Sequence, residues 1–341
     1  MQPGKPIGGA LLLVVMMGAG LVCQTGAQTL NTAETRTGQT DRAATHQAVS
    51  QEVGPPDVYL DTLLVRDELE WIRLEMGKPQ DTRREIEVTG AAPREVFFQA
   101  LTLFQKANRL SFDLTRERAE LPGKPIGDIR AVHVGSVVNA TLERLRRVKD
   151  YLRGPQPGRE RPRDPTKTTS DIFRSIVQAN RQLNLLLDQS FTPTDVFQQV
   201  TLAVGYAAQL RTRFPGTRML DPPAFEPHKR PVDVYHRLVE CFARVRDIIE
   251  NSGLDALMLG GHPEVATPSD VYDIASLIVS ELSFLHSHLD GALTPPDRYD
   301  PGRKFPSDVY QRAGLLEALL LDLQARVEVS STWLQAEDAR E

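Results

Sequence analysis

The residues that could carry out chemistry in this sequence are its histidines, its cysteines and a set of acids that recur at fixed spacing. His286 and His288 are two residues apart, and on a helix this separates their side chains by about 200°, too far to chelate one metal ion. His236 and Cys241 are five apart and also diverge. No nucleophile elbow, zinc-protease, phosphate-loop or dinucleotide fingerprint occurs. We therefore predict no catalytic residues, no metal site and no cofactor.

The recurring acids belong to a short pattern: proline, any residue, an acid, valine or isoleucine, then an aromatic residue. They could be paired catalytic carboxylates or a cation site. However, proline is favoured at the first position of a helix, and an acid two residues later can accept hydrogen bonds from the free backbone N–H groups there. We therefore interpret them as helix starts. The acids are Asp57, Glu95, Asp171, Asp195, Asp233, Asp270 and Asp308; one copy lacks the proline, and a degenerate copy ends at His133.

The aromatic residues of the pattern stand at the same end of each expected helix. They could form a ring around a ligand pocket or a peptide groove, or they could pack against the incoming linker. Their link to the helix start favours packing. As candidate binding residues we keep Tyr59, Tyr235, Tyr272 and Tyr310.

The segment 143–167 has the most uneven charge in the chain, with nine basic and four acidic residues. Arg159, Arg161 and Arg163 alternate within it and are further candidates for a binding surface. Such a cluster could dock an anionic partner at residues 144–167, or it could be a solvated helix end and loop.

The spacing of the pattern predicts the fold class. About 18 residues with apolar side chains at steps of three and four follow each copy, as in a helix with one buried face. The valine or isoleucine positions are 58, 96, 132, 172, 196, 234, 271 and 309, so the last four follow the first four by 138, 138, 139 and 137 residues. We predict an all-α protein of two tandem four-helix blocks, 55–190 and 191–330, related by internal duplication, with a C-terminal tail at 331–341. The alternative is an extended solenoid of helix-plus-linker units.

Long linkers rich in proline and glycine separate the helices within each block. A linker of roughly 15 residues can reach about 50 Å, more than the length of a 20-residue helix, so it could return along the bundle or make a wide corner. Helix order and direction therefore stay open. Only the junction Ser190–Thr192 is short enough to suggest an antiparallel pair.

The N-terminus has the features of a secretory signal peptide over residues 1–27. Lys5 precedes the apolar run 7–22, and small residues at Thr25 and Ala27 permit cleavage before Gln28. One alternative is that the segment is retained as a membrane anchor, although the apolar run is short for a membrane span. A weaker alternative is a lipoprotein with a lipid attached to Cys23. Residues 28–54 are polar and predict a disordered leader. After cleavage only Cys241 remains, which we expect to be a small buried side chain.

The formal net charge of −5 gives no argument for nucleic acid as a partner, and we expect no membrane span in the mature chain. The leading hypothesis is a non-enzymatic exported protein of the bacterial envelope, in the periplasm, that binds a protein partner or a ligand. The alternatives are an enzyme whose site is assembled between the two blocks and a small-molecule sensor bundle. Titratable side chains that converge between the blocks would favour the enzyme. A dry apolar contact between them, with an exposed apolar strip, would favour protein interaction.

Overall fold

The structure is a computed structural model, and it describes residues 53–125, 127–155, 161–187, 191–260, 266–289, 295, 301–330 and 333–334. The chain divides into two units, 1–50 and 51–341, and every described residue belongs to the second. The predicted signal peptide and almost all of the predicted leader lie outside the described residues.

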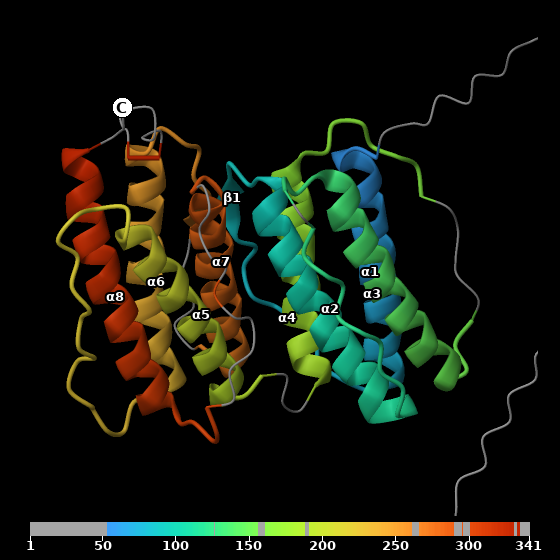
Figure 1. The fold of residues 1–341 in the computed structure, drawn as a ribbon. Helices are drawn as coiled ribbons and strands as arrows, with labels where there is room; N and C mark the ends of the chain where they lie inside the picture. The colour runs from blue at the N-terminus through green and yellow to red at the C-terminus, as the bar shows by residue number, and fades with distance from the viewer. Residues whose placement is uncertain are drawn as a thin grey trace, which may run out of the picture. The chain divides into compact units, whose positions relative to one another are not determined.

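The described part of the chain is mostly helical, as predicted (Figure 1). Its helices are α1 (Pro55–Glu75), α2 (Pro93–Thr115), α3 (Ala131–Tyr151), α4 (Thr169–Leu186), α5 (Pro193–Arg211), α6 (Pro231–Asn251), α7 (Pro268–Ser287) and α8 (Pro306–Val329). Two three-residue strands, β1 (Glu87–Thr89) and β2 (Met258–Gly260), complete the regular structure. No helix among the described residues has both the length and the hydropathy that a bilayer span requires.

The recurring acids cap the helix starts, which confirms the role predicted for them. In each acid-bearing copy, a carboxylate oxygen accepts a hydrogen bond from the backbone N–H of the residue that precedes the helix, at 2.7–2.9 Å. In the degenerate copy, Nδ1 of His133 accepts from the N–H of Arg130 at 3.1 Å. Every helix thus meets a hydrogen-bond acceptor at its positive end.

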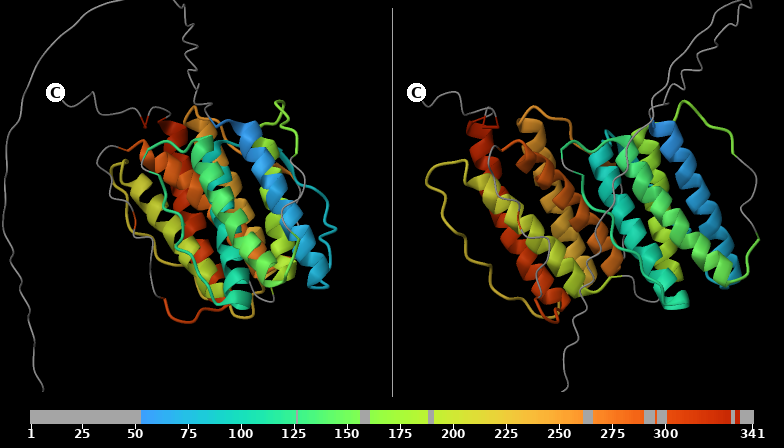
Figure 2. Two further views of the ribbon diagram at one scale, coloured as in Figure 1. Left: turned by 90° about the vertical axis from the view of Figure 1, so that its right-hand side faces the viewer. Right: turned by 45° about the vertical axis from the view of Figure 1, so that its right-hand side comes forward.

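The helices pack in two groups of four, α1–α4 and α5–α8. In the second group, the valines and prolines that begin the four helices surround one void of about 20 Å³, so the four starts meet at one end. In the first group, Ala91 before α2 donates a hydrogen bond to Ser170 at the start of α4, at 3.3 Å, and Gly135 near the start of α3 lies against Val58 of α1. All helices of a group therefore run in the same direction, and described linkers such as 212–230 return along the outside (Figures 1 and 2).

The two groups run in opposite directions. Helix α4 ends and α5 begins at the same end of the molecule (Figure 1), but the two helices do not pack as the antiparallel pair that the short junction suggested. The extensive helix contact between the groups is that of α2 with α7 rather than α4 with α5. A small antiparallel sheet, with Val88 opposite Leu259, joins the linker before α2 to the linker before α7. The sequence analysis did not predict these strands.

Candidate functional site

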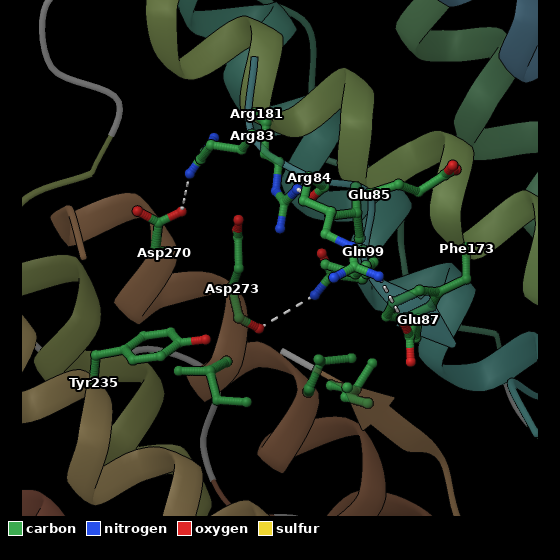
Figure 3. A pocket seen from close by; sticks show the side chains of 16 residues that line it. Arg83, Arg84, Glu85, Glu87, Gln99, Phe173, Arg181, Tyr235, Asp270 and Asp273 are labelled. Carbon is green, nitrogen blue, oxygen red and sulfur yellow. Dashed lines mark hydrogen bonds and ion pairs between the residues drawn. The ribbon is translucent and has the colours of Figure 1, made fainter. Parts of the chain in front are cut away.

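A cavity of about 640 Å³ lies between the two groups of helices (Figure 3). Helices α2 and α4 line it on one side and α6 and α7 on the other, while the linker residues Arg83–Glu87 and the strand β2 form its rim. Residues from both four-helix groups are therefore needed to form it.

Helices α4 and α7 supply opposite walls of the cavity. Phe173, Val177 and Arg181 follow one another at four-residue steps on one face of α4, and Asp270, Ile274 and Leu277 do so at steps of four and three on α7. Because the two helices run in opposite directions, Arg181 and Asp270 belong to the same end of the cavity, whereas Phe173 and Leu277 belong to the other. The two helical walls thus have a charged end and an apolar end, while Glu85 and Glu87 of the rim lie near Phe173 (Figure 3).

A buried ion pair stands at the charged end. Nζ of Lys106 on α2 lies 3.2 and 3.3 Å from the two carboxylate oxygens of Asp273 on α7, and the lysine side chain has no exposed surface. Burial lowers the pKa of Lys106 and raises that of Asp273, in each case against the attraction of the partner. Gln99 also donates to the backbone carbonyl of Asp273, at 3.2 Å. These contacts fix α2 against α7.

Arg83 connects the linker of the first group to the start of α7. Its guanidinium lies 2.9 Å from Asp81 and 3.1 Å from Asp270, which also caps its own helix through Thr267. Burial opposes the charge of Arg83, but hydrogen bonds and attraction from the two carboxylates outweigh it and raise the arginine pKa. Both acids are thus already engaged.

Arg181 differs from the other charged residues of the cavity. Its Nη1 donates to the backbone carbonyl of Arg84 at 2.9 Å, and within the described part of the chain it forms no ion pair with a carboxylate. Burial lowers its pKa, and the nearby positive charge of Arg83 lowers it further. This half-buried cation therefore lacks a direct counter-ion.

Tyr235 on α6 brings a phenol to the same cavity (Figure 3). Burial, followed by the negative charge of Asp270, raises its pKa to about 12. The hydroxyl therefore stays protonated at neutral pH and can act as a hydrogen-bond donor or acceptor, but not readily as a base.

The four candidate tyrosines do not converge on one site. Tyr235 lines the cavity, whereas Tyr59 lies under Nζ of Lys167, 5.0 Å from the ring centre. Tyr310 lies under the guanidinium of Arg237, 3.8 Å away.

Tyr272 is buried in packing contacts. It stacks on Phe191 with ring centres 3.7 Å apart, and its hydroxyl accepts from Gln199 at 2.7 Å and donates to Gln105 at 3.2 Å. Three of the four tyrosines thus take part in local packing contacts.

The basic cluster is largely paired with acids from other segments. Arg161 binds Asp67 through two hydrogen bonds at 2.6 and 2.8 Å, and Arg163 binds Asp57 at 2.5 and 3.1 Å. Arg159 lies outside the described residues. Lys149 and Arg147 pair with Glu68 and Glu117, each at 2.7 Å. The uneven charge of segment 143–167 therefore overstates the positive charge left for a partner.

The sequence analysis missed Arg83, Arg181, Lys106 and Asp273. The sequence did contain an indication of a polar face on α2, since Glu95, Gln99, Thr102 and Lys106 follow one another at steps of four, three and four. Such a polar stripe normally indicates the solvent face of a helix, but here all four residues are buried against the other group. Helix α7, apolar on nearly every face, carried the matching signal of a helix buried on all sides.

Among the described residues, no group of three or more His, Cys, Asp or Glu side chains is placed to hold a metal ion. Cys241 is buried, and burial raises the pKa of its thiol. The chain matches no protein-family model, no curated protein and no solved structure.

Proposed function

We propose that this protein is a non-enzymatic binding module that holds a small organic molecule in the cavity between its two four-helix bundles. The observation that carries the proposal is the cavity itself: about 640 Å³, with walls from both bundles that are charged at one end and apolar at the other. Cavities of roughly 300–1,000 Å³ with a few placed polar groups in an otherwise apolar lining are the usual form of a small-molecule site.

The character of the contact between the bundles favours a ligand site over a surface for protein docking. A docking module would be expected to join its halves through a dry apolar contact, whereas here the contact contains Lys106, Asp273 and Glu281, all largely buried. Polar groups of this kind are costly to bury unless they are paired or serve recognition. A protein partner in the envelope stays a prediction from the sequence.

The same polar groups give less support to catalysis. Asp273 is held by Lys106, Asp270 is held by Arg83 and by its own helix start, and Tyr235 keeps its proton at neutral pH. A general base needs a pKa near the working pH and access to the proton it removes. The groups in this cavity are better suited to orienting a ligand than to moving its protons.

Two further parts of the proposal rest on sequence. The near-constant offset between the two sets of helix starts supports an origin by internal duplication of a four-helix block, and the shared capping chemistry agrees with it. The signal-like N-terminus supports export to the periplasm.

Fluorescence titration of the intact chain with N-phenyl-1-naphthylamine, a neutral apolar probe, tests the binding proposal. We expect saturable binding of one probe per chain. Val177→Trp fills the cavity and should weaken binding at least tenfold, while Leu321→Trp, at an exposed position of α8 outside the cavity lining, should leave it unchanged. Circular dichroism verifies that both variants fold. The absence of saturable binding, or equal binding by the Val177→Trp variant, contradicts the proposal.

A further inference from the structure

Among the described residues at the charged end of the cavity, Arg181 is a cation with no carboxylate within ion-pair distance. Arg181 lies on α4 with Phe173 and Val177 on the same face, so its guanidinium closes one end of a wall that is otherwise apolar. It uses Nη1 on the carbonyl of Arg84, 2.9 Å away, which leaves its other N–H groups for a second partner.

The acids of the cavity are engaged elsewhere. Asp273 is paired with Lys106. Glu85 accepts a hydrogen bond from Gln178 at 2.8 Å, and Glu87 lies at the exposed rim beside Arg84.

Asp81 and Asp270 both pair with Arg83, so these three residues together carry one excess negative charge. The carboxylate of Asp270 also lies at the positive end of the α7 dipole, which offsets part of its charge. Their attraction for Arg181 acts only from beyond ion-pair distance. A half-buried guanidinium in this setting gains most from an anionic group that arrives with a ligand, because a charge-assisted contact in a poorly solvated site is stronger than one in water.

We infer that the ligand of this cavity is a small amphipathic organic anion, with its acidic group on Arg181 and its apolar body against Phe173, Val177, Ile274 and Leu277. This inference rests on the proposed function, since it assigns the ligand class of the same cavity. A carboxylate or a phosphate can meet a guanidinium with two parallel hydrogen bonds, so both head groups fit the site. Tyr235 offers a hydroxyl at the same end.

A matched pair of probes separates this inference from the proposed function. 8-Anilino-1-naphthalenesulfonate is N-phenyl-1-naphthylamine with an added sulfonate. The difference in affinity between the two probes therefore measures the contribution of the negatively charged group to binding. We expect the anionic probe to bind at least tenfold more tightly than the neutral one. Arg181→Gln should remove this preference by weakening the anionic probe about tenfold or more, while the neutral probe changes less than twofold. Arg109→Gln, which removes an exposed arginine outside the cavity lining, is the control.

Competition identifies the head group. Octanoate, octyl phosphate and octanol are each titrated against the bound anionic probe, with inorganic phosphate as a fourth competitor. Displacement by octanoate or by octyl phosphate, and not by octanol or inorganic phosphate, supports an amphipathic anion and shows which acid the site prefers.

The outcomes are distinct. If neither probe binds, the cavity is not a ligand site and both proposals fail. If the neutral probe binds and Val177→Trp abolishes its binding, but the sulfonate adds nothing or Arg181→Gln leaves the anionic probe unchanged, only the anionic ligand is ruled out. Displacement by octanol as strong as that by octanoate leads to the same conclusion.

Discussion

Glu95 and Glu281 both lie against the guanidinium of Arg94 in the contact between the two bundles, although their side chains are only 0% and 1% exposed. Glu95 caps the start of α2 by accepting from the N–H of Ala92 at 2.7 Å, and Glu281 lies on α7. Arg94 reaches both carboxyl groups, at 2.8 and 3.2 Å. One cation therefore faces two acids, and burial together with the charge of Glu281 raises the pKa of Glu95 well above its ordinary value. Glu95 therefore retains its proton under conditions in which exposed carboxyl groups have lost theirs.

This pair makes stability depend on pH in a direction opposite to that of ordinary carboxylates. Because the pKa of Glu95 is raised by folding, the contribution of the pair is complete below the unfolded pKa near 4.5 and is lost as pH rises through the folded pKa. Glu281→Gln removes the repulsion and should raise the free energy of unfolding more at pH 8 than at pH 5, as measured by urea denaturation. Glu70→Gln, at an exposed ion pair, should show no such difference. A Glu281→Gln effect of equal size at both pH values contradicts a raised pKa of Glu95 caused by the charge of Glu281.

Removing one partner of the Lys106–Asp273 pair should lower the free energy of unfolding strongly, whereas replacing both partners with apolar residues should lower it little. Asp273→Ala leaves the lysine charge buried without a partner, and we expect a loss of roughly 3 kcal/mol in the free energy of unfolding. The double variant Lys106→Met, Asp273→Leu should recover most of that loss, because neither charge is then buried. Guanidinium denaturation of the two variants measures the difference. A double variant as unstable as the single one would show that the pair acts through packing rather than charge.

The histidine cap of α3 is the weakest of the eight helix starts. Nδ1 of His133 can accept from Arg130 only while it carries no proton, and a neutral ring contributes nothing to the helix dipole. Replacement of His133 by Asp, which restores the recurring pattern, should stabilise the protein by about 0.5–1 kcal/mol at pH 7. Thermal unfolding of the variant and the parent protein tests this. A decrease in stability would mean that the imidazole has another role.

Gly314 allows a returning linker to lie close to its bundle. A Cβ atom at this position of α8 would stand 2.7 Å from Pro223 and 2.9 Å from Arg237, whereas a Cβ at Gly135 of α3 would meet ordinary contacts of 3.5 Å or more. Gly to Ala inside a helix is normally worth up to about 1 kcal/mol of stability. We therefore expect Gly135→Ala to stabilise the protein and Gly314→Ala to destabilise it, as measured by urea denaturation. The same sign for both substitutions would show that linker 212–230 does not depend on this close approach.

The helices and their starts could be predicted from the sequence because a proline and an acid act locally. Asp195 accepts from Thr192 and Asp308 from Phe305, three residues away in each case, so neighbouring residues determine the cap. The direction of successive helices could not be predicted, because a linker long enough to return along the bundle is also long enough to make a corner.

The candidate site depends on contacts between distant parts of the chain. Arg83 meets Asp270 at a separation of 187 residues, and Lys106 meets Asp273 at 167. No local spacing connects such pairs. For segment 143–167 the sequence overestimated the positive charge available to a partner. A count of charges along the segment could not include Asp57 and Asp67, which pair with Arg163 and Arg161.

The parallel course of the helices within each bundle also has a kinetic consequence. In an up-and-down bundle, neighbouring helices meet across a short turn, but here each helix reaches a neighbour of its own group only after the chain has travelled back along that neighbour. Contacts between neighbouring helices of one bundle thus join residues separated by a whole helix and its return segment, and loop closure precedes any gain from this packing. We expect this protein to refold more slowly than other helical proteins of its size. The apolar faces of its helices would then stay exposed to solvent for longer before they pack.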